Sequence, residues 1–276
     1  MNDERGGADS LRDDADGLAT RLTGLAGPPS AGHAVRILRA VGIPARHYDV
    51  YVRADGPVGP LYVSCDEHRA ITGSALAAAV GGPESFEAAY HARVGRPVFP
   101  VRTSPPGMSS ALRTGRTGKL PFALTGLTDA EQALLGAVRS IPPGQLRPAS
   151  WVSARAGVAA PEETVVALLA RNPAPVLVPC HRVEVRRGAP EGAPGPYPPE
   201  VGLALRVAEG VDVERVSRFA ERQVRYLGSD TTRIYCHPTC AQARRIIPVH
   251  QVPFRSAGEA VASGYRGCKS CLPEAV

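Results

Sequence analysis

The sequence lacks several features that mark whole classes of protein. It has no apolar run of about 18 residues, the minimum for a membrane-spanning helix, so we expect no membrane span. Its first residues, MNDERGGADSLRDDADG, contain neither an apolar core nor an Arg/Ser-rich amphipathic pattern, and they predict no targeting signal. We interpret residues 1–30 as a disordered lead.

Cysteine is also scarce, with six in 276 residues. Secreted domains that depend on disulfides are shorter and much denser in cysteine. Two cysteines stand alone, at Cys65 and Cys180, and the other four are Cys236, Cys240, Cys268 and Cys271. This clustering indicates metal binding in a reducing compartment, and we expect the cytoplasm.

The chain has a surplus of basic residues. Its net charge is +6, and residues 211–276 hold ten Lys/Arg against six Asp/Glu, or +4 of that total. A basic surface favours a polyanionic partner without proving one.

The predicted elements give an α+β fold built from separate blocks. After the lead we expect a small sheet domain at 31–100, a Pro/Gly/Ser-rich linker at 101–119, a helical domain at 120–210 and a compact domain at 211–276. In the helical domain, residues 128–140, 150–156 and 161–171 show helical patterns, and the last two form a helix-turn-helix outline. Cys65 and Trp151 are interpreted as core residues.

The four C-terminal cysteines have the spacing of a metal site. They read C-x3-C, then 27 residues, then C-x2-C. Two close pairs of thiols match a tetrahedral zinc site, and such a metal supplies much of the folding energy of a small domain. We therefore predict Zn²⁺ bound by all four.

The strings TTRIYCHPTC and EAVASGYRGCKSCLP resemble the zinc-binding methylphosphotriester domain of Ada-type DNA repair proteins over residues 212–274. The resemblance implies that Cys236 is both a zinc ligand and the acceptor of a methyl group from a DNA phosphate. It also implies DNA-backbone contacts by Thr232, Arg244 and Arg266, for which solvated surface side chains are the alternative interpretation. The sequence departs from the family at Arg233 and His237, neither of which replaces a ligand.

A second motif, RNPAPVLVPCHRV, resembles the active site of O6-alkylguanine-DNA alkyltransferases. The resemblance spans residues 48–211 and is strong only at 171–183. It implies a small RNase H-like domain before the helical one, and irreversible alkylation of Cys180. By the same resemblance, the catalytic partners would be His181 and Glu209, and the residues that handle DNA would be Asn172 and Tyr197. Glu209 is a few residues out of register.

Two departures from that family concern DNA handling. Glu163 occupies the place of the base-flipping arginine, and Ala149 that of the tyrosine that rotates the phosphate. A carboxylate facing phosphates repels them. Four interpretations of Cys180 stay open: a repair cysteine with weakened DNA handling, an acceptor for small electrophiles or altered bases, a relic, or an unrelated packed cysteine.

The two resemblances occur in the reverse of the familiar Ada order, and residues 211–228 leave too little chain for a separate regulatory helix-turn-helix between them. We predict a single-turnover methylated-DNA–protein-cysteine methyltransferase that acts as a monomer on alkylated double-stranded DNA in the nucleoid. The prediction includes a role in transcription regulation. The alternative is a non-catalytic, zinc-dependent DNA-binding or regulatory protein with a degenerate alkyltransferase domain.

Overall fold

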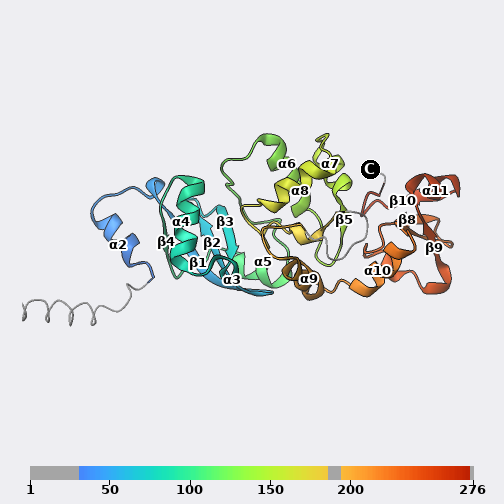
Figure 1. Ribbon diagram of the computed structural model, residues 1–276, viewed down its shortest axis with the longest axis horizontal. Helices are drawn as coiled ribbons and strands as arrows, with labels where there is room; N and C mark the ends of the chain where they lie inside the picture. Colours follow the sequence, from blue (N-terminus) through green and yellow to red (C-terminus); the bar gives the residue numbers. More distant parts are fainter. Residues whose placement is uncertain (1–30, 186–193, 274–276) are drawn as a thin grey trace, which may run out of the picture.

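A computed structural model describes residues 31–185 and 194–273. It confirms the predicted α+β fold, with helices and three sheets that follow one another along the long axis of the molecule (Figure 1). The predicted lead, 1–30, lies outside the described residues. Among the helices of the described residues, none combines the length and apolarity needed to cross a bilayer.

The N-terminal sheet has the strand order β3-β2-β1-β4. Strands β1 and β2 form an antiparallel hairpin, and β4 returns parallel to β1. Aromatic rings of the sheet and of α4 pack together, with Tyr51, Tyr62 and Phe86 in mutual contact. The elements of this part are α2 (His33–Ala40), η1 (Ala45–His47), β1 (Asp49–Gly56), β2 (Gly59–Cys65), β3 (Ile71–Leu76), α3 (Ala77–Val80), α4 (Pro83–Val94) and β4 (Val98–Pro100).

The segment predicted as a linker, 101–119, contains the helix α5 (Met108–Thr114). Met108, Ala111 and Leu112 on this helix are buried in the same hydrophobic cluster as residues of the first sheet and of the helical part. Apolar residues three and four apart lie on one face of a helix, and this short stripe is hidden in the sequence by the surrounding Pro, Gly and Ser. Helix α5, the first sheet and the helical part therefore contribute to one shared hydrophobic cluster.

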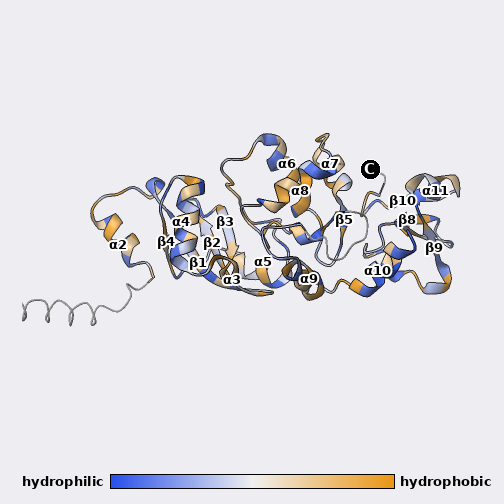
Figure 2. Cartoon of the chain, in the orientation of Figure 1, coloured by the Kyte–Doolittle hydropathy of each residue, from blue (hydrophilic) through white to orange (hydrophobic). Residues whose placement is uncertain are grey.

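The helical part is built on α6 (Asp129–Arg139), α7 (Ala149–Ala156) and α8 (Glu162–Ala170), close to the predicted helices. Thr128 and Glu131 form a capping box at the start of α6, which satisfies two N–H groups that a helix start otherwise leaves free. Figure 2 shows α8 as largely hydrophobic, in agreement with its buried Val165, Leu168 and Leu169.

A short parallel pair of strands places the PCHRV motif in this core. Strand β5 (Arg147–Pro148) pairs with β6 (Val183–Glu184). The 3-10 turn η2 (Cys180–Arg182) precedes β6 directly, and α9 (Pro199–Ala208) packs beside it. The reactive motif is therefore held between a strand and a helix.

The C-terminal part is a four-stranded sheet of order β10-β8-β7-β9 with short helices. One buried cluster contains the four cysteines with Leu227 and Ala243, and another is aromatic. Its elements are α10 (Val213–Glu221), β7 (Tyr226–Ser229), β8 (Ile234–Cys236), η3 (Ala243–Arg245), η4 (Pro248–His250), β9 (Gln251–Phe254), α11 (Ala257–Ala262) and β10 (Arg266–Gly267).

Candidate functional site

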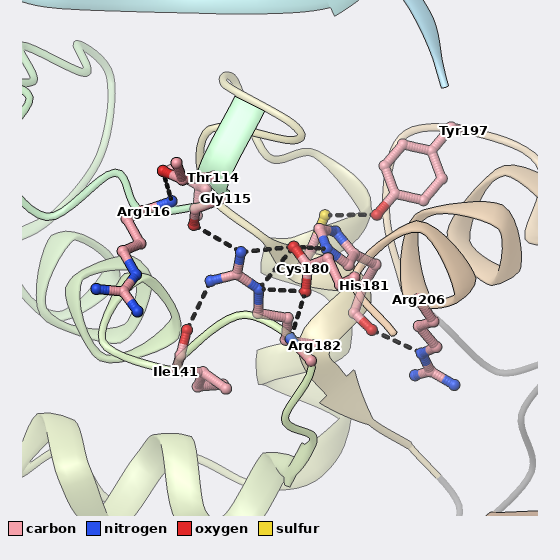
Figure 3. A network of polar contacts seen from close by, with 12 residues as sticks. Thr114, Gly115, Arg116, Ile141, Cys180, His181, Arg182, Tyr197 and Arg206 are labelled. Carbon is pink, nitrogen blue, oxygen red and sulfur yellow. Dashed lines mark hydrogen bonds and ion pairs between the residues drawn. The ribbon is translucent and has the colours of Figure 1, made fainter. Parts of the chain in front are cut away.

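Cys180 is completely buried, with 0% of its surface exposed. Its Sγ lies 3.1 Å from the Tyr197 hydroxyl (Figure 3). The Asn172 amide nitrogen lies 3.5 Å from the same sulfur. Burial raises the pKa of the Cys180 thiol, and the hydrogen bonds with Tyr197 and Asn172 act in the opposite direction. The sulfur thus has two polar neighbours that stabilise a thiolate in an apolar core.

Asn172 is held in place by the turn that leads to Cys180. Its side-chain nitrogen donates to the Val178 carbonyl at 3.0 Å, and its oxygen accepts from the Ala174 N–H at 3.0 Å. The amide therefore has a fixed direction, with its N–H₂ toward the sulfur. The sequence motif RNP placed Asn172 before the cysteine, and the structure adds this contact.

His181 lies 3.0 Å from Glu209, measured between Nε2 and Oε1. Glu209 also accepts from both Arg182 and the Gly144 backbone N–H. Burial by itself would raise the pKa of Glu209, but hydrogen bonds from His181 and Arg182 outweigh it and lower the pKa to about 2. Glu209 is therefore a carboxylate at neutral pH.

The same geometry sets the proton positions on His181. A carboxylate only accepts hydrogen bonds, so Nε2 carries the hydrogen and Nδ1 keeps its lone pair. Burial lowers the pKa of His181, although Glu209 opposes that shift. Among the described residues, Nδ1 has no hydrogen-bond partner. The imidazole is thus neutral, oriented and able to accept a proton.

Two buried arginines hold this arrangement, and sequence reasoning missed both. Arg182 donates to the carbonyls of Ile141 and Gly115 as well as to Glu209 (Figure 3). Arg206 donates to the carbonyls of His181 and Val183. The only sequence signal was the place of Arg182 inside PCHRV, because these partners are distant in the chain.

The second cluster is formed by the four C-terminal cysteines. Their sulfur atoms all lie within 4.8 Å of one another. Four sulfurs around one zinc ion at about 2.3 Å would be roughly 3.8 Å apart, so the cluster is close to that geometry. A soft four-sulfur donor set fits a metal such as zinc, which binds cysteines as thiolates.

A cavity of about 470 Å³ opens beside Cys236. Two of the predicted backbone-contacting residues, Thr232 and Arg266, line it. The third, Arg244, is not among its lining residues and lies on a neighbouring hollow. Arg245 and Lys269 do line the cavity, and the sequence analysis missed them.

The other residues discussed in the sequence analysis lie outside these two sites. Cys65 is buried in β2, and burial raises its pKa to about 11. Ala149 is fully buried at the start of α7, and Glu163 is exposed in the first turn of α8. Trp151 is a buried residue, as expected for a core position, and it also reaches the C-terminal part by a hydrogen bond to the Cys271 carbonyl.

Comparison with known families agrees with both sites. Residues 129–211 match the family model for the 6-O-methylguanine DNA methyltransferase, DNA binding domain. Residues 214–274 match the model for the metal binding domain of Ada. The helical part is therefore similar to the first of these domains and the C-terminal part to the second, in that order along the chain.

Curated relatives match part of the chain. A methylated-DNA–protein-cysteine methyltransferase of Methanothermobacter thermautotrophicus is 41% identical over 91 residues, which is 32% of this chain and 48%, or about half, of the relative. A protein of the same name from Salmonella typhimurium is 29% identical over 144 residues, 50% of this chain and 84% of the relative. The solved structure of a Mycobacterium tuberculosis O6-methylguanine methyltransferase aligns with a TM-score of 0.43 at 22% identity, covering 58% of this chain and 92% of that one.

Proposed function

We propose that this protein repairs alkylated DNA by transferring alkyl groups irreversibly to its own cysteines. The matched domains and relatives indicate methyl transfer from DNA to cysteine. The methyl group of a methylphosphotriester would go to Cys236, and an alkyl group from O6-alkylguanine to Cys180. Each cysteine would act once, because a thioether is not readily converted back to a thiol.

The observation that supports Cys180 is the pair of polar groups at its sulfur, the Tyr197 hydroxyl at 3.1 Å and the Asn172 amide at 3.5 Å. As the family resemblance implies, the neutral His181, oriented by Glu209 at 3.0 Å, would take the thiol proton through a water molecule. The new sulfur–carbon bond would form as the carbon–oxygen bond to guanine breaks, and the guanine oxygen would leave with the electron pair. Tyr197 would line the pocket for the base.

The observation that supports Cys236 is its place in the wall of a basic cavity. Arg245, Arg266 and Lys269 line the same cavity and would attract a DNA phosphate. Bound zinc would keep the four thiols deprotonated at neutral pH. Attack by the Cys236 sulfur on the methyl carbon would then release an ordinary phosphodiester anion.

The proposed substrate is double-stranded DNA, bound by a monomer. The helix-turn-helix formed by α7 and α8 belongs to the region that matches a DNA-binding domain. We propose that the protein acts on nucleoid DNA in the cytoplasm.

Peptide mass spectrometry of the full-length chain, digested after incubation with DNA, tests both acceptors. DNA with methylated backbone phosphates should add one methyl group to the peptide containing Cys236. An oligonucleotide with O6-methylguanine should add one to the peptide containing Cys180. Cys65 is the internal control, since its raised pKa of about 11 disfavours the reactive thiolate.

The variants Cys236→Ser and Cys180→Ser should each lose one of the two additions and keep the other. If no cysteine gains mass while DNA still binds, the protein is the non-catalytic DNA-binding alternative. The acidic start of α8 has its own test: Glu163→Arg should speed methylation of Cys180 if repulsion from phosphates limits the reaction. An unchanged rate would count against that explanation.

A further inference from the structure

The helical part and the four-cysteine centre are in direct contact. The Leu146 N–H donates to the Thr239 hydroxyl at 2.8 Å, and that hydroxyl lies 3.2 Å from the Leu146 carbonyl. The Trp151 indole donates to the Cys271 carbonyl at 3.0 Å. Thr239 precedes one metal-site cysteine and Cys271 is another. The surface of the helical part thus adjoins the centre itself.

Arg147 lies in the middle of these contacts, with only 1% of its surface exposed. Its guanidinium donates to the Leu146 carbonyl at 2.7 Å and to the Gln145 side-chain oxygen at 2.6 Å, both neutral groups. Among the described residues, no ion pair joins Arg147 to a carboxylate. A buried cation that lacks a nearby counter-charge is costly.

Arg147 also lies over Trp151, with its guanidinium carbon 5.7 Å from the centre of the ring whose N–H donates to the Cys271 carbonyl. Burial lowers the pKa of the guanidinium, and the charges of Cys271, Cys240, Glu184 and Cys236, in that order, raise it again. A divalent ion with four thiolates has a net charge of −2, which would favour a guanidinium beside the centre.

We propose that Arg147 is a positioning residue for the metal centre, a counter-charge that the alkyltransferase-like part supplies to the four thiolates of the Ada-like part. The inference rests on metal binding in the proposed function, but not on methyl transfer. It makes the helical part a component of the metal site.

The proposal has a consequence for the other cysteine. Arg147 pairs with Val183 in the β5–β6 ladder, directly after Cys180, His181 and Arg182. Methylation of Cys236 would turn one thiolate into a neutral thioether and the net charge from −2 to −1. The electrostatic attraction between Arg147 and the metal centre would then be halved. Because Arg147 belongs to β5, which pairs with β6 beside Cys180, the pull on that strand pair would weaken as well.

Zinc affinity of the full-length chain, measured by competition with a chelating dye, tests the proposal. Arg147→Met should bind zinc about 10- to 100-fold more weakly, the range for lost outer-shell partners. Arg147→Lys keeps the charge and should restore most of that loss. The matched control is Arg139→Met, because Arg139 is a half-buried arginine against an aromatic ring, Phe122, and the cysteines are not among the groups that shift its pKa. It should bind zinc as the wild type does.

Equal zinc affinity of the wild type and Arg147→Met would overturn the proposal. So would a loss in Arg139→Met as large as that in Arg147→Met, since the effect would then reflect general stability. If Arg147→Met does not fold, Arg147→Lys alone tests the proposal. Zinc binding by Arg147→Lys that is about 100-fold weaker than that of the wild type would then contradict the role of the positive charge. If the wild type does not bind zinc, that result would instead contradict the proposed function of Cys236.

Discussion

At the scale of single residues, the environment of His181 decides what Cys180 can do. The imidazole is buried and bonded to a carboxylate, and these two influences have opposite effects on its pKa. Burial is the larger, so the ring stays neutral at pH values where an exposed histidine would be charged. A neutral ring is the form that can accept the thiol proton.

The pH profile of Cys180 alkylation follows from that balance. Because burial lowers the pKa of His181 below its ordinary 6.5, the single-turnover rate should fall to half only below pH 6.5. The rate is measured with an O6-methylguanine oligonucleotide from about pH 5 to 8. A rate already halved at pH 6.5 or above would contradict the role of His181 as base.

Glu209 should contribute to stability in a pH-dependent way. Its pKa is lowered from 4.5 to about 2 in the folded protein, so the contribution is complete above about pH 5 and is lost as the pH falls toward 2. The full difference corresponds to about 3 kcal/mol. Between pH 7 and pH 3, the wild type should lose about 2 kcal/mol more unfolding free energy than Glu209→Gln, measured by urea denaturation. Equal losses would show that Glu209 is not the responsible group.

Sequence motifs named the cysteine, histidine and glutamate of this site but not the arginines that hydrogen-bond around them. The PCHRV motif located Cys180 and His181, and Glu209 was named as the partner despite its shifted register. Arg182 and Arg206 were missed because they bond to backbone carbonyls, and no side-chain pattern records where a carbonyl will point. Arg245 and Lys269 were missed for a similar reason, since a cavity wall is assembled from separate turns.

At the scale of elements, local signals identified the helices with caps. The helical pattern predicted at 128–140 is α6, and Thr128 and Glu131 form a capping box at its start with both hydrogen bonds present. Helix α5 was taken for linker because its stripe of buried residues is only two turns long. The distinction is physical: a cap is a local contact, whereas burial of a short stripe depends on partners distant in the chain.

Thr128→Ala should destabilise the protein by about 1 kcal/mol, the usual cost of losing an N-cap. The Thr128 side chain accepts from the Glu131 N–H at 3.3 Å, and that N–H would lose its partner. Chemical denaturation gives the difference. Thr114→Ala is the control, because the exposed Thr114 hydroxyl only bonds back to the Ser110 carbonyl in its own helix, and its cost should stay within about 0.5 kcal/mol.

At the scale of the whole molecule, the placement of the C-terminal part was beyond the sequence. The spacing of the cysteines predicted a compact metal domain, but not that Trp151, Leu146 and Arg147 would adjoin it. Those contacts join residues about a hundred positions apart, such as Trp151 and Cys271. Two folded surfaces that complement each other in shape and charge leave no periodic pattern in the sequence of either part.

Metal removal can be followed through that contact. Trp151 is the only tryptophan of the chain, and it is 5% exposed beside the cysteine centre. Chelation should unfold the small C-terminal part, since the cysteines make up most of one of its buried clusters. Trp151 emission should then shift to longer wavelength, and added zinc should reverse the shift. An emission spectrum that chelator leaves unchanged would contradict the docking of the two parts.

Two glycines show how widely the constraints on Cys180 extend. Gly115 and Gly144 both have positive φ, and a Cβ would come within 2.7 Å of an Arg182 nitrogen at the first and within 2.6 Å of the Glu209 backbone oxygen at the second. Any side chain at either position would push apart the groups that orient His181. In a saturation library selected for survival of an alkylating drug, Gly115 and Gly144 should tolerate replacement as poorly as Cys180.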